Sequence, residues 1–166
     1  MRIYWLNEFE KGDLGMMARP KGNDWLKDEI ITLKELGICS IVSLLESNEE
    51  IELEIEKEKE LCEHLNIDFI CFPIRDRKVP KDDDSFIQLI SRINHKLYHG
   101  EKIVVHCRMG IRRTSMVAAG VLIKNGIDAN AVFNLLSKIR TLSVPDTREQ
   151  KQWVIDRTNR LQKRLR

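Results

Sequence analysis

The chain has 166 residues, the length of one domain, and its 42% hydrophobic and 33% charged residues describe a soluble globular protein rather than a disordered one. Its 28 Lys and Arg residues against 26 Asp and Glu residues leave a formal net charge of +2, too balanced for a nucleic-acid-binding protein. No apolar run reaches the ~18–20 residues of a membrane span, and residues 1–20 have no signal-peptide core. We therefore expect a cytoplasmic monomer without a transmembrane segment or a nucleic-acid partner.

Charge is nevertheless segregated along the chain. Residues 46–60 carry eight glutamates against two lysines, and residues 148–166 are mostly basic. We interpret both segments as solvated helix faces, with a docking surface as the alternative. The cysteines Cys39, Cys62, Cys71 and Cys107 form no paired CxxC motif, so we predict a reducing compartment, no disulfide and no metal site.

Apolar patterns predict strands and helices in alternation. Short β-rich runs predict strands at residues 2–6, 16–20, 38–45, 67–74 and 102–106. Helical spacing predicts helices from residue 23 or 24 to 36, over 49–65, 85–99 and 113–124, from 128 onward, and over 147–165. The helix over 49–65 rests on its Glu, Lys and Leu content, because three apolar residues there alternate as in a strand.

Strands separated by helices imply a mostly parallel sheet covered on both faces. We therefore predict a single α/β domain over residues 1–166, with a central sheet flanked by helices.

The informative segment runs from residue 103 to residue 114 and reads IVVHCRMGIRRT. Cys107 follows a buried strand, five residues pass, and Arg113 opens a helix that is apolar all round. At the carboxyl end of such a strand, the amides of residues 108–113 and the positive end of the helix can surround an anion. The same surroundings favour a thiolate over a thiol, so Cys107 is a candidate nucleophile.

Other residues of the segment fit this interpretation. The planar fork of Arg113 can hold two phosphoryl oxygens at once, and Gly110 allows the backbone to bend around the anion. Thr114 can donate its hydroxyl to the sulfur. His106 is expected to orient the loop rather than to act as the base, since a thiolate needs none. We predict the phosphate-binding residues to be Arg108, Met109, Gly110, Ile111, Arg112 and Arg113.

This segment resembles the signature His-Cys-x-x-Gly-x-x-Arg-Ser/Thr of the cysteine-dependent protein tyrosine phosphatases, in their compact dual-specificity-like branch. The resemblance implies a protein tyrosine phosphatase-like fold and a general-acid aspartate on a loop upstream of the cysteine. Asp76 lies 31 residues before Cys107, just past a predicted strand. Such an acid protonates the departing oxygen. The rivals Asp82, Asp83 and Asp84 follow Pro80 and are typical of a solvated helix start.

The C-terminal segment around Trp153 is also similar to this branch. A glutamine positions the hydrolytic water in the wider superfamily, and the resemblance points to Gln150, with Gln152 as the alternative. Helix capping by Asp146 or Thr147 is an equally good interpretation of the segment.

One residue departs from the family pattern. Arg112 stands where relatives carry Gly or Ser, and we expect its side chain to point outward. Together with Arg108, Arg75, Arg77 and Lys78 it predicts a basic rim that favours polyanionic or acidic-flanked phosphosubstrates.

The resulting hypothesis is a metal-free, cofactor-free hydrolase of phosphomonoesters, acting through a cysteinyl phosphate on phosphotyrosine and on phosphoserine or phosphothreonine in proteins. The alternatives are a phosphoinositide phosphatase and a catalytically weak module that binds phosphorylated partners. A sulfurtransferase has no need of Asp76. An arsenate reductase of the small-phosphatase type needs resolving cysteines, whereas Cys39, Cys62 and Cys71 are predicted to be buried.

Overall fold

The computed structural model describes residues 1–145 and 147–163 of the chain. Its centre is a five-stranded sheet with the strand order β1-β2-β5-β3-β4. The strands are β1 (Ile3–Leu6), β2 (Asp13–Ala18), β3 (Ile38–Ser43), β4 (Asp68–Cys71) and β5 (Lys102–Cys107). Only the edge pair β1 and β2 is antiparallel, so β5, the middle strand, has parallel neighbours on both sides.

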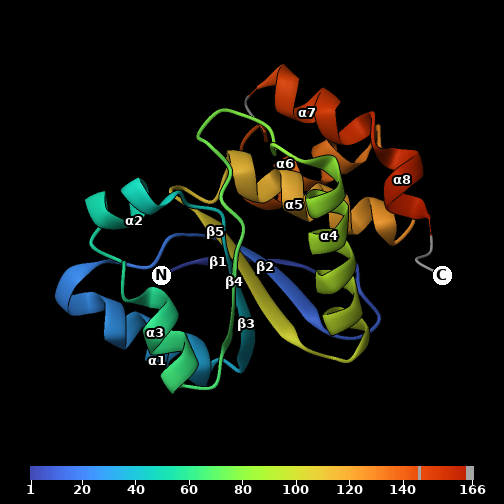
Figure 1. Cartoon of the computed structure of the whole chain (residues 1–166). Coiled ribbons are helices and arrows are strands. Elements are labelled where there is room, and N and C mark those ends of the chain that lie inside the picture. Colours follow the sequence, from blue (N-terminus) through green and yellow to red (C-terminus); the bar gives the residue numbers. More distant parts are fainter. Residues whose placement is uncertain (146, 164–166) are drawn as a thin grey trace.

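Helices cover both faces of this sheet, as Figure 1 shows. On one side lie the short 3-10 turn η1 (Asn23–Trp25), α1 (Leu26–Glu35), α2 (Ser47–Glu52) and α3 (Glu58–His64). On the other side lie α4 (Asp83–Tyr98), α5 (Arg112–Lys124), α6 (Val132–Arg140), α7 (Arg148–Ile155) and α8 (Thr158–Gln162). This arrangement confirms the predicted α/β fold with a mostly parallel sheet.

Alternation along β5 divides its side chains between two hydrophobic cores. Ile103 and Val105 belong to the core formed with α4 and α5, whereas Val104 belongs to the core formed with α1 and α3. All three side chains are fully buried. A strand that is buried on both faces has a continuous run of apolar residues, and this run allowed β5 to be predicted from the sequence.

Two helices predicted as continuous are broken. The segment predicted as one helix over 49–65 forms α2 and α3, separated by a turn in which Glu54 takes a left-handed φ of +56°. This turn buries Ile55, so tertiary packing overrides the helix propensity of the glutamates. The last predicted helix forms α7 and α8, and the bend lets both Val154 and Leu161 reach the core. Residues 164–166 lie outside the described part of the chain.

The predicted burial of the cysteines is partly wrong. Cys62 and Cys107 are buried, whereas Cys39 and Cys71 are exposed. Cys71 ends the edge strand β4, and Cys39 lies where the pairing of β3 with β5 shifts register between Ile38 and Ser40. An edge strand and a bulge both leave side chains uncovered. Among the described residues, no helix combines the length and the apolar character needed to cross a membrane.

Candidate active site

Cys107 is the last residue of β5, and the cysteine loop (residues 107–113) joins it to α5. The Cys107 carbonyl accepts a hydrogen bond of 2.8 Å from the backbone N–H of Arg19, just after β2. The loop therefore begins at the carboxyl edge of three parallel strands, β2, β5 and β3. In open α/β sheets this edge is where ligands bind.

Gly110 makes the tight path of the loop possible. Its φ of +63° lies in the left-handed region, which favours glycine, and a Cβ atom there would lie only 2.3 Å from the backbone carbonyl of Met17. Both the dihedral angle and the contact with β2 exclude a side chain. The structure thus gives the signature glycine a physical reason.

The sulfur of Cys107 lies in a polar environment at the start of a long buried helix. The Thr114 hydroxyl donates a hydrogen bond of 3.1 Å to Sγ. The first turn of α5 begins at Arg112, so its free N–H groups and positive dipole end lie beside the thiol. Sγ therefore lies beside a hydroxyl donor and the N-terminal end of a helix, which are the surroundings that cysteine nucleophiles have in enzymes.

Arg113 is held by a buried clamp. Its guanidinium is 1% exposed and forms two hydrogen bonds to the Glu49 carboxylate, from Nη1 to Oε2 at 2.6 Å and from Nη2 to Oε1 at 2.8 Å. Nη1 also donates to the carbonyls of Leu44 at 3.3 Å and Ile74 at 2.9 Å. Nothing in the sequence distinguishes Glu49 from the other glutamates around it.

The clamp shifts both titrating groups toward their charged forms. Burial raises the pKa of Glu49, but the hydrogen bonds and charge of Arg113 outweigh it, so the net pKa of Glu49 is lowered. Burial likewise lowers the pKa of Arg113, yet the hydrogen bonds to Glu49 and the electrostatic interactions with the groups around the guanidinium, Glu49 among them, outweigh burial and raise the net pKa. Arg113 and Glu49 therefore form a buried ion pair.

Glu49 occupies only one edge of the guanidinium. Because both Nη atoms bind its carboxylate, the remaining edge consists of Nε and the second proton of Nη2. Nε is buried, with no hydrogen-bond partner among the described residues. Asp76 Oδ1 lies 3.9 Å from Nη2. An oxyanion bound to the free edge would therefore lie near both the predicted acid and Cys107.

Asp76 stands on a tight turn that a second element supports. The Lys78 N–H donates 3.0 Å to the Arg75 carbonyl, and Arg77 takes a φ of +59°. The turn is tied to α7, because Gln150 Nε2 donates 2.8 Å to the Lys78 carbonyl. Gln150 is fully buried.

Gln150 is therefore engaged at both ends of its amide, since its Oε1 accepts a hydrogen bond of 2.9 Å from the Thr147 hydroxyl. Thr147 also caps α7 by accepting from the Gln150 N–H. Gln152 bonds Asp156 instead. The water-positioning role of Gln150 stays a prediction, and Asp146, the other predicted cap, lies outside the described residues.

The rival aspartates have structural partners. Asp82 caps α4 by accepting from the Ser85 N–H at 2.8 Å, and this bond and the one from the Ser85 hydroxyl lower the pKa of Asp82. Asp83 pairs with Arg157 at 2.8 Å, and Asp84 pairs with Arg160. These contacts leave Asp76 as the aspartate next to Arg113.

His106 faces away from Cys107, toward α3. Both it and Glu58 are almost fully buried, and His106 Nε2 lies 2.9 Å from Glu58 Oε1 without hydrogen-bond alignment. Glu58, like Glu49, belongs to the glutamate-rich segment predicted as a solvated face. For these two residues that prediction is wrong, because each is buried against a positive or polar group of the signature.

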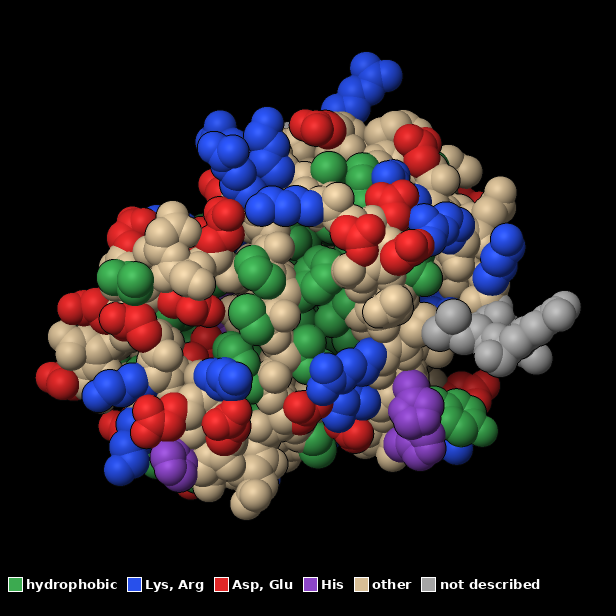
Figure 2. All heavy atoms as spheres, viewed as in Figure 1, with side chains coloured by type: hydrophobic (Ala, Val, Ile, Leu, Met, Phe, Trp, Pro, Cys, Tyr) green, Lys and Arg blue, Asp and Glu red, His purple; other side chains and the backbone are tan. Residues whose placement is uncertain are grey.

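The predicted basic rim is only partly correct. Arg108 lies against α2 and not over the site, with a hydrogen bond of 2.7 Å to Glu52. Arg112 Nη1 lies 3.9 Å from Asp76 Oδ1, and its side chain is 30% exposed. Arg75, Arg77 and Lys78 are exposed, and Figure 2 shows Lys and Arg side chains gathered over the loop between β4 and α4.

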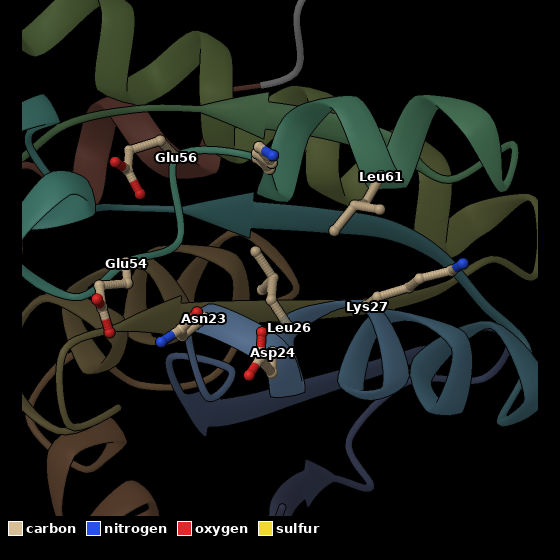
Figure 3. Close-up of a pocket in the computed structure, with 8 residues that line it drawn as sticks. Asn23, Asp24, Leu26, Lys27, Glu54, Glu56 and Leu61 are labelled. Carbon is tan, nitrogen blue, oxygen red and sulfur yellow. The ribbon is translucent and has the colours of Figure 1, made fainter.

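A cavity of about 560 Å³ lies elsewhere, between α1 and α3 (Figure 3). Asp24, Lys27, Glu54 and Glu56 line it, and no residue of the signature does. The described residues contain no cluster of three or more His, Cys, Asp or Glu side chains that could hold a metal ion.

Solved structures of phosphatases share this fold. Kinase associated phosphatase, with its catalytic-site cysteine replaced by serine, has a TM-score of 0.90 at 21% identity, covering 99% of this chain and 98% of that one. PTPMT1 in complex with PI(5)P has a TM-score of 0.75 at 14% identity, covering 95% and 96%. TpbA of P. aeruginosa in complex with pTyr has a TM-score of 0.63 at 16% identity, covering 90% and 83%.

No curated protein matches the chain. A family model does match it, over residues 15–127, which include β5, the cysteine loop and Asp76. The model is described as "Polymorphic toxin system, DSP-PTPase phosphatase". The signature, the fold and this match agree with one another: the chain belongs to this DSP-PTPase family, within the cysteine-dependent protein tyrosine phosphatases.

Proposed function

We propose that the chain hydrolyses phosphomonoesters through a cysteinyl-phosphate intermediate formed on Cys107. The observation that carries this proposal is the orientation of Arg113. Glu49 and two backbone carbonyls fix the guanidinium while its Nε and Nη2 edge stays available beside Asp76. Preorganised donors of this kind stabilise the charge that develops on a transferring phosphoryl group.

In the first step the Cys107 thiolate attacks phosphorus, an S–P bond forms and the P–O bond to the leaving group breaks. Arg113 and the amides of residues 108–113 bind the equatorial oxygens, and Asp76 gives its proton to the leaving oxygen. In the second step water attacks phosphorus while Asp76 takes a proton from it. The S–P bond breaks, and the Thr114 hydroxyl stabilises the thiolate that leaves.

The proposed substrates are phosphorylated proteins, with both phosphotyrosine and phosphoserine or phosphothreonine accepted. Family membership supports this choice, and the phosphotyrosine bound by TpbA belongs to the same class. We assign residues 1–166 to a single phosphatase domain, since α7, outside the 15–127 match, contributes Gln150 to the support of the Asp76 turn.

The test is hydrolysis of p-nitrophenyl phosphate in the presence of EDTA by the wild type and by Cys107→Ser. We expect activity in the wild type and none in the variant. A second comparison tests the acid, because nitrophenolate leaves without help from a proton and phenolate does not. Asp76→Asn should therefore lose more activity on phenyl phosphate than on p-nitrophenyl phosphate. A folded but inactive wild type would favour the phosphate-binding module.

A further inference from the structure

The strand β1 lies at one edge of the sheet, and its outer side is uncovered. Among the described residues, the backbone of Ile3–Leu6 has no hydrogen-bond partner outside β2. Such an edge offers free N–H and C=O groups to a strand of another chain. Proteins usually protect an edge with a charged residue, a proline or a bulge, and β1 has none of these. The opposite edge strand, β4, does carry a charge, because Asp68 pairs with Arg92 and Lys96.

A groove, which we call the edge groove, lies between β1 and the end of α1. Two cavities of about 390 and about 440 Å³ form it and share Trp5 and Leu36 in their lining. Its apolar side chains are partly uncovered, since Met1 is 48% and Leu36 is 49% exposed. The polar residues of the lining are Asn7, Asp13, Glu29, Thr32 and Lys102. An apolar groove beside an open strand edge is a surface suited to another polypeptide.

Only one face of β1 is open in this way. On the other face Tyr4 lies beneath the guanidinium of Arg140, at 3.8 Å from the ring centroid, and Leu6 is 1% exposed. On the open face Ile3 and Trp5 lie against β2 at Gly15, where an added Cβ would be 2.4 Å from Ile3 Cγ2. A strand paired with this edge would direct every second side chain toward the edge groove.

The strand that fits this edge is β1 of a second copy of the chain. A twofold axis at Trp5 pairs the two strands antiparallel, so Trp5 meets its own symmetry mate and Ile3 lies opposite Asn7 of the second copy. The two indole rings then face each other across the axis, on the side of the edge groove. An aromatic pair at directly opposed positions stabilises an antiparallel pair of strands.

The charges at the ends of β1 are complementary in the same register. Arg2 of each copy lies opposite Glu8 of the other, and the symmetry produces this pair twice. Both side chains are exposed, and neither has an ion-pair partner among the described residues. A register shifted by one residue would place both charges opposite uncharged side chains.

We propose that the protein forms a symmetric dimer in which β1 pairs with β1 of a second copy and joins the two sheets into one. This inference departs from the monomer expected from the sequence. It does not depend on the proposed function, because the interface uses no residue of the cysteine loop and none of the Asp76 turn. Closed twofold dimers with self-complementary interfaces are the commonest protein oligomers.

The first test is sedimentation velocity of the whole chain between about 1 and about 200 µM. The weight-average mass should rise toward twice the monomer mass. One short strand and one groove per copy make a small interface, so we expect a dissociation constant on the order of 10 µM. Amide hydrogen exchange locates the interface, because exchange in residues 3–6 should slow as the concentration rises.

Charge reversal tests the register without touching the core, because Arg2 and Glu8 are both exposed. Arg2→Glu and Glu8→Arg each place like charges opposite one another at both ends, and each should raise the dissociation constant about tenfold. The double variant Arg2→Glu/Glu8→Arg restores both pairs and should dimerise like the wild type. The control Lys57→Glu makes the same charge change at an exposed lysine of the α1–α3 cavity and should leave dimerisation unchanged.

Three results would overturn the inference: a monomer at every concentration, a dimer that withstands the single charge reversals or is not restored in the double variant, or a dimer whose exchange in residues 3–6 is as fast as in the monomer. Absence of p-nitrophenyl phosphate hydrolysis would instead contradict the proposed function and leave the dimer untouched.

Discussion

Substitution of Glu49 by glutamine tests how the fold holds Arg113. Glutamine has nearly the same shape but offers one acceptor where the carboxylate offers two, and it removes the counter-charge of a guanidinium that is 1% exposed. Breaking a buried ion pair from one side costs about 3–5 kcal/mol, and the retained amide oxygen places this variant near the lower limit. At about 2–4 °C per kcal/mol for a domain of this size, the melting temperature should fall by about 6–12 °C.

The same substitution should lower kcat about 100-fold, because a guanidinium without its clamp no longer presents a fixed edge to the phosphoryl group. Circular dichroism melts and p-nitrophenyl phosphate kinetics measure the two effects. The neighbouring Glu50→Gln is the control. Burial and the nearby charge of Glu58 raise the pKa of Glu50, so removing its charge should be neutral or stabilising.

The pH dependence supplies an independent check. The folded-state pKa of Glu49 is lowered, so its contribution to stability is present above the ordinary carboxyl pKa and is lost as pH falls through the lower folded value. The difference in melting temperature between wild type and Glu49→Gln should therefore shrink below about pH 4. If Glu49→Gln were as stable and as active as the wild type at neutral pH, the conclusion that the Glu49 carboxylate holds Arg113 in place would be refuted.

Three further predictions concern the supports of the site. Gly110→Ala should abolish most activity in kinetic assays, because its Cβ would lie 2.3 Å from the Met17 carbonyl; activity close to wild type would mean that the loop takes another path. Gln150→Ala should reduce activity on phenyl phosphate more than on p-nitrophenyl phosphate, as Asp76→Asn does, because it frees the Asp76 turn; an equal loss on both would favour the water-positioning role. Burial raises the pKa of the Cys62 thiol to about 12, so mass spectrometry after iodoacetamide treatment of the folded protein at neutral pH should find Cys62 unmodified while Cys107 reacts.

The sequence was sufficient for the parts of the fold and site that depend on local pattern. β5 is buried on both faces and α5 is buried all round, so both appear as apolar runs of the expected length. The chemistry of the cysteine loop lies within consecutive residues, so its glycine, arginine and threonine could be assigned from spacing alone. Asp76 was predicted from the resemblance, which implies a general acid on a loop upstream of the cysteine, and it lies on the loop that follows β4.

The buried glutamates that hold the site residues in place could not be predicted from local sequence pattern. Glu49 and Glu58 belong to a run of glutamates, and in a helix-forming segment of that composition nothing marks which carboxylates turn inward. Their burial depends on the break at Glu54, which turns α2 toward Arg113 and α3 toward His106. That break is set by the burial of Ile55, a tertiary contact.

The two buried glutamates also explain why an acidic segment can border a site that binds anions. A carboxylate near the phosphoryl group would repel it, yet Glu49 binds a different edge of Arg113 from the one left available, and Glu58 lies next to His106 on the α3 side of β5. Each carboxylate thus contacts a residue of the signature, Arg113 or His106, on a side that does not face the bound phosphoryl group. The basic residues of the Asp76 loop, Arg75, Arg77 and Lys78, are exposed, and Figure 2 shows Lys and Arg side chains gathered over this loop. Two glutamates of the acidic segment are thus buried beneath the site, whereas the basic residues of the Asp76 loop lie on the surface beside it.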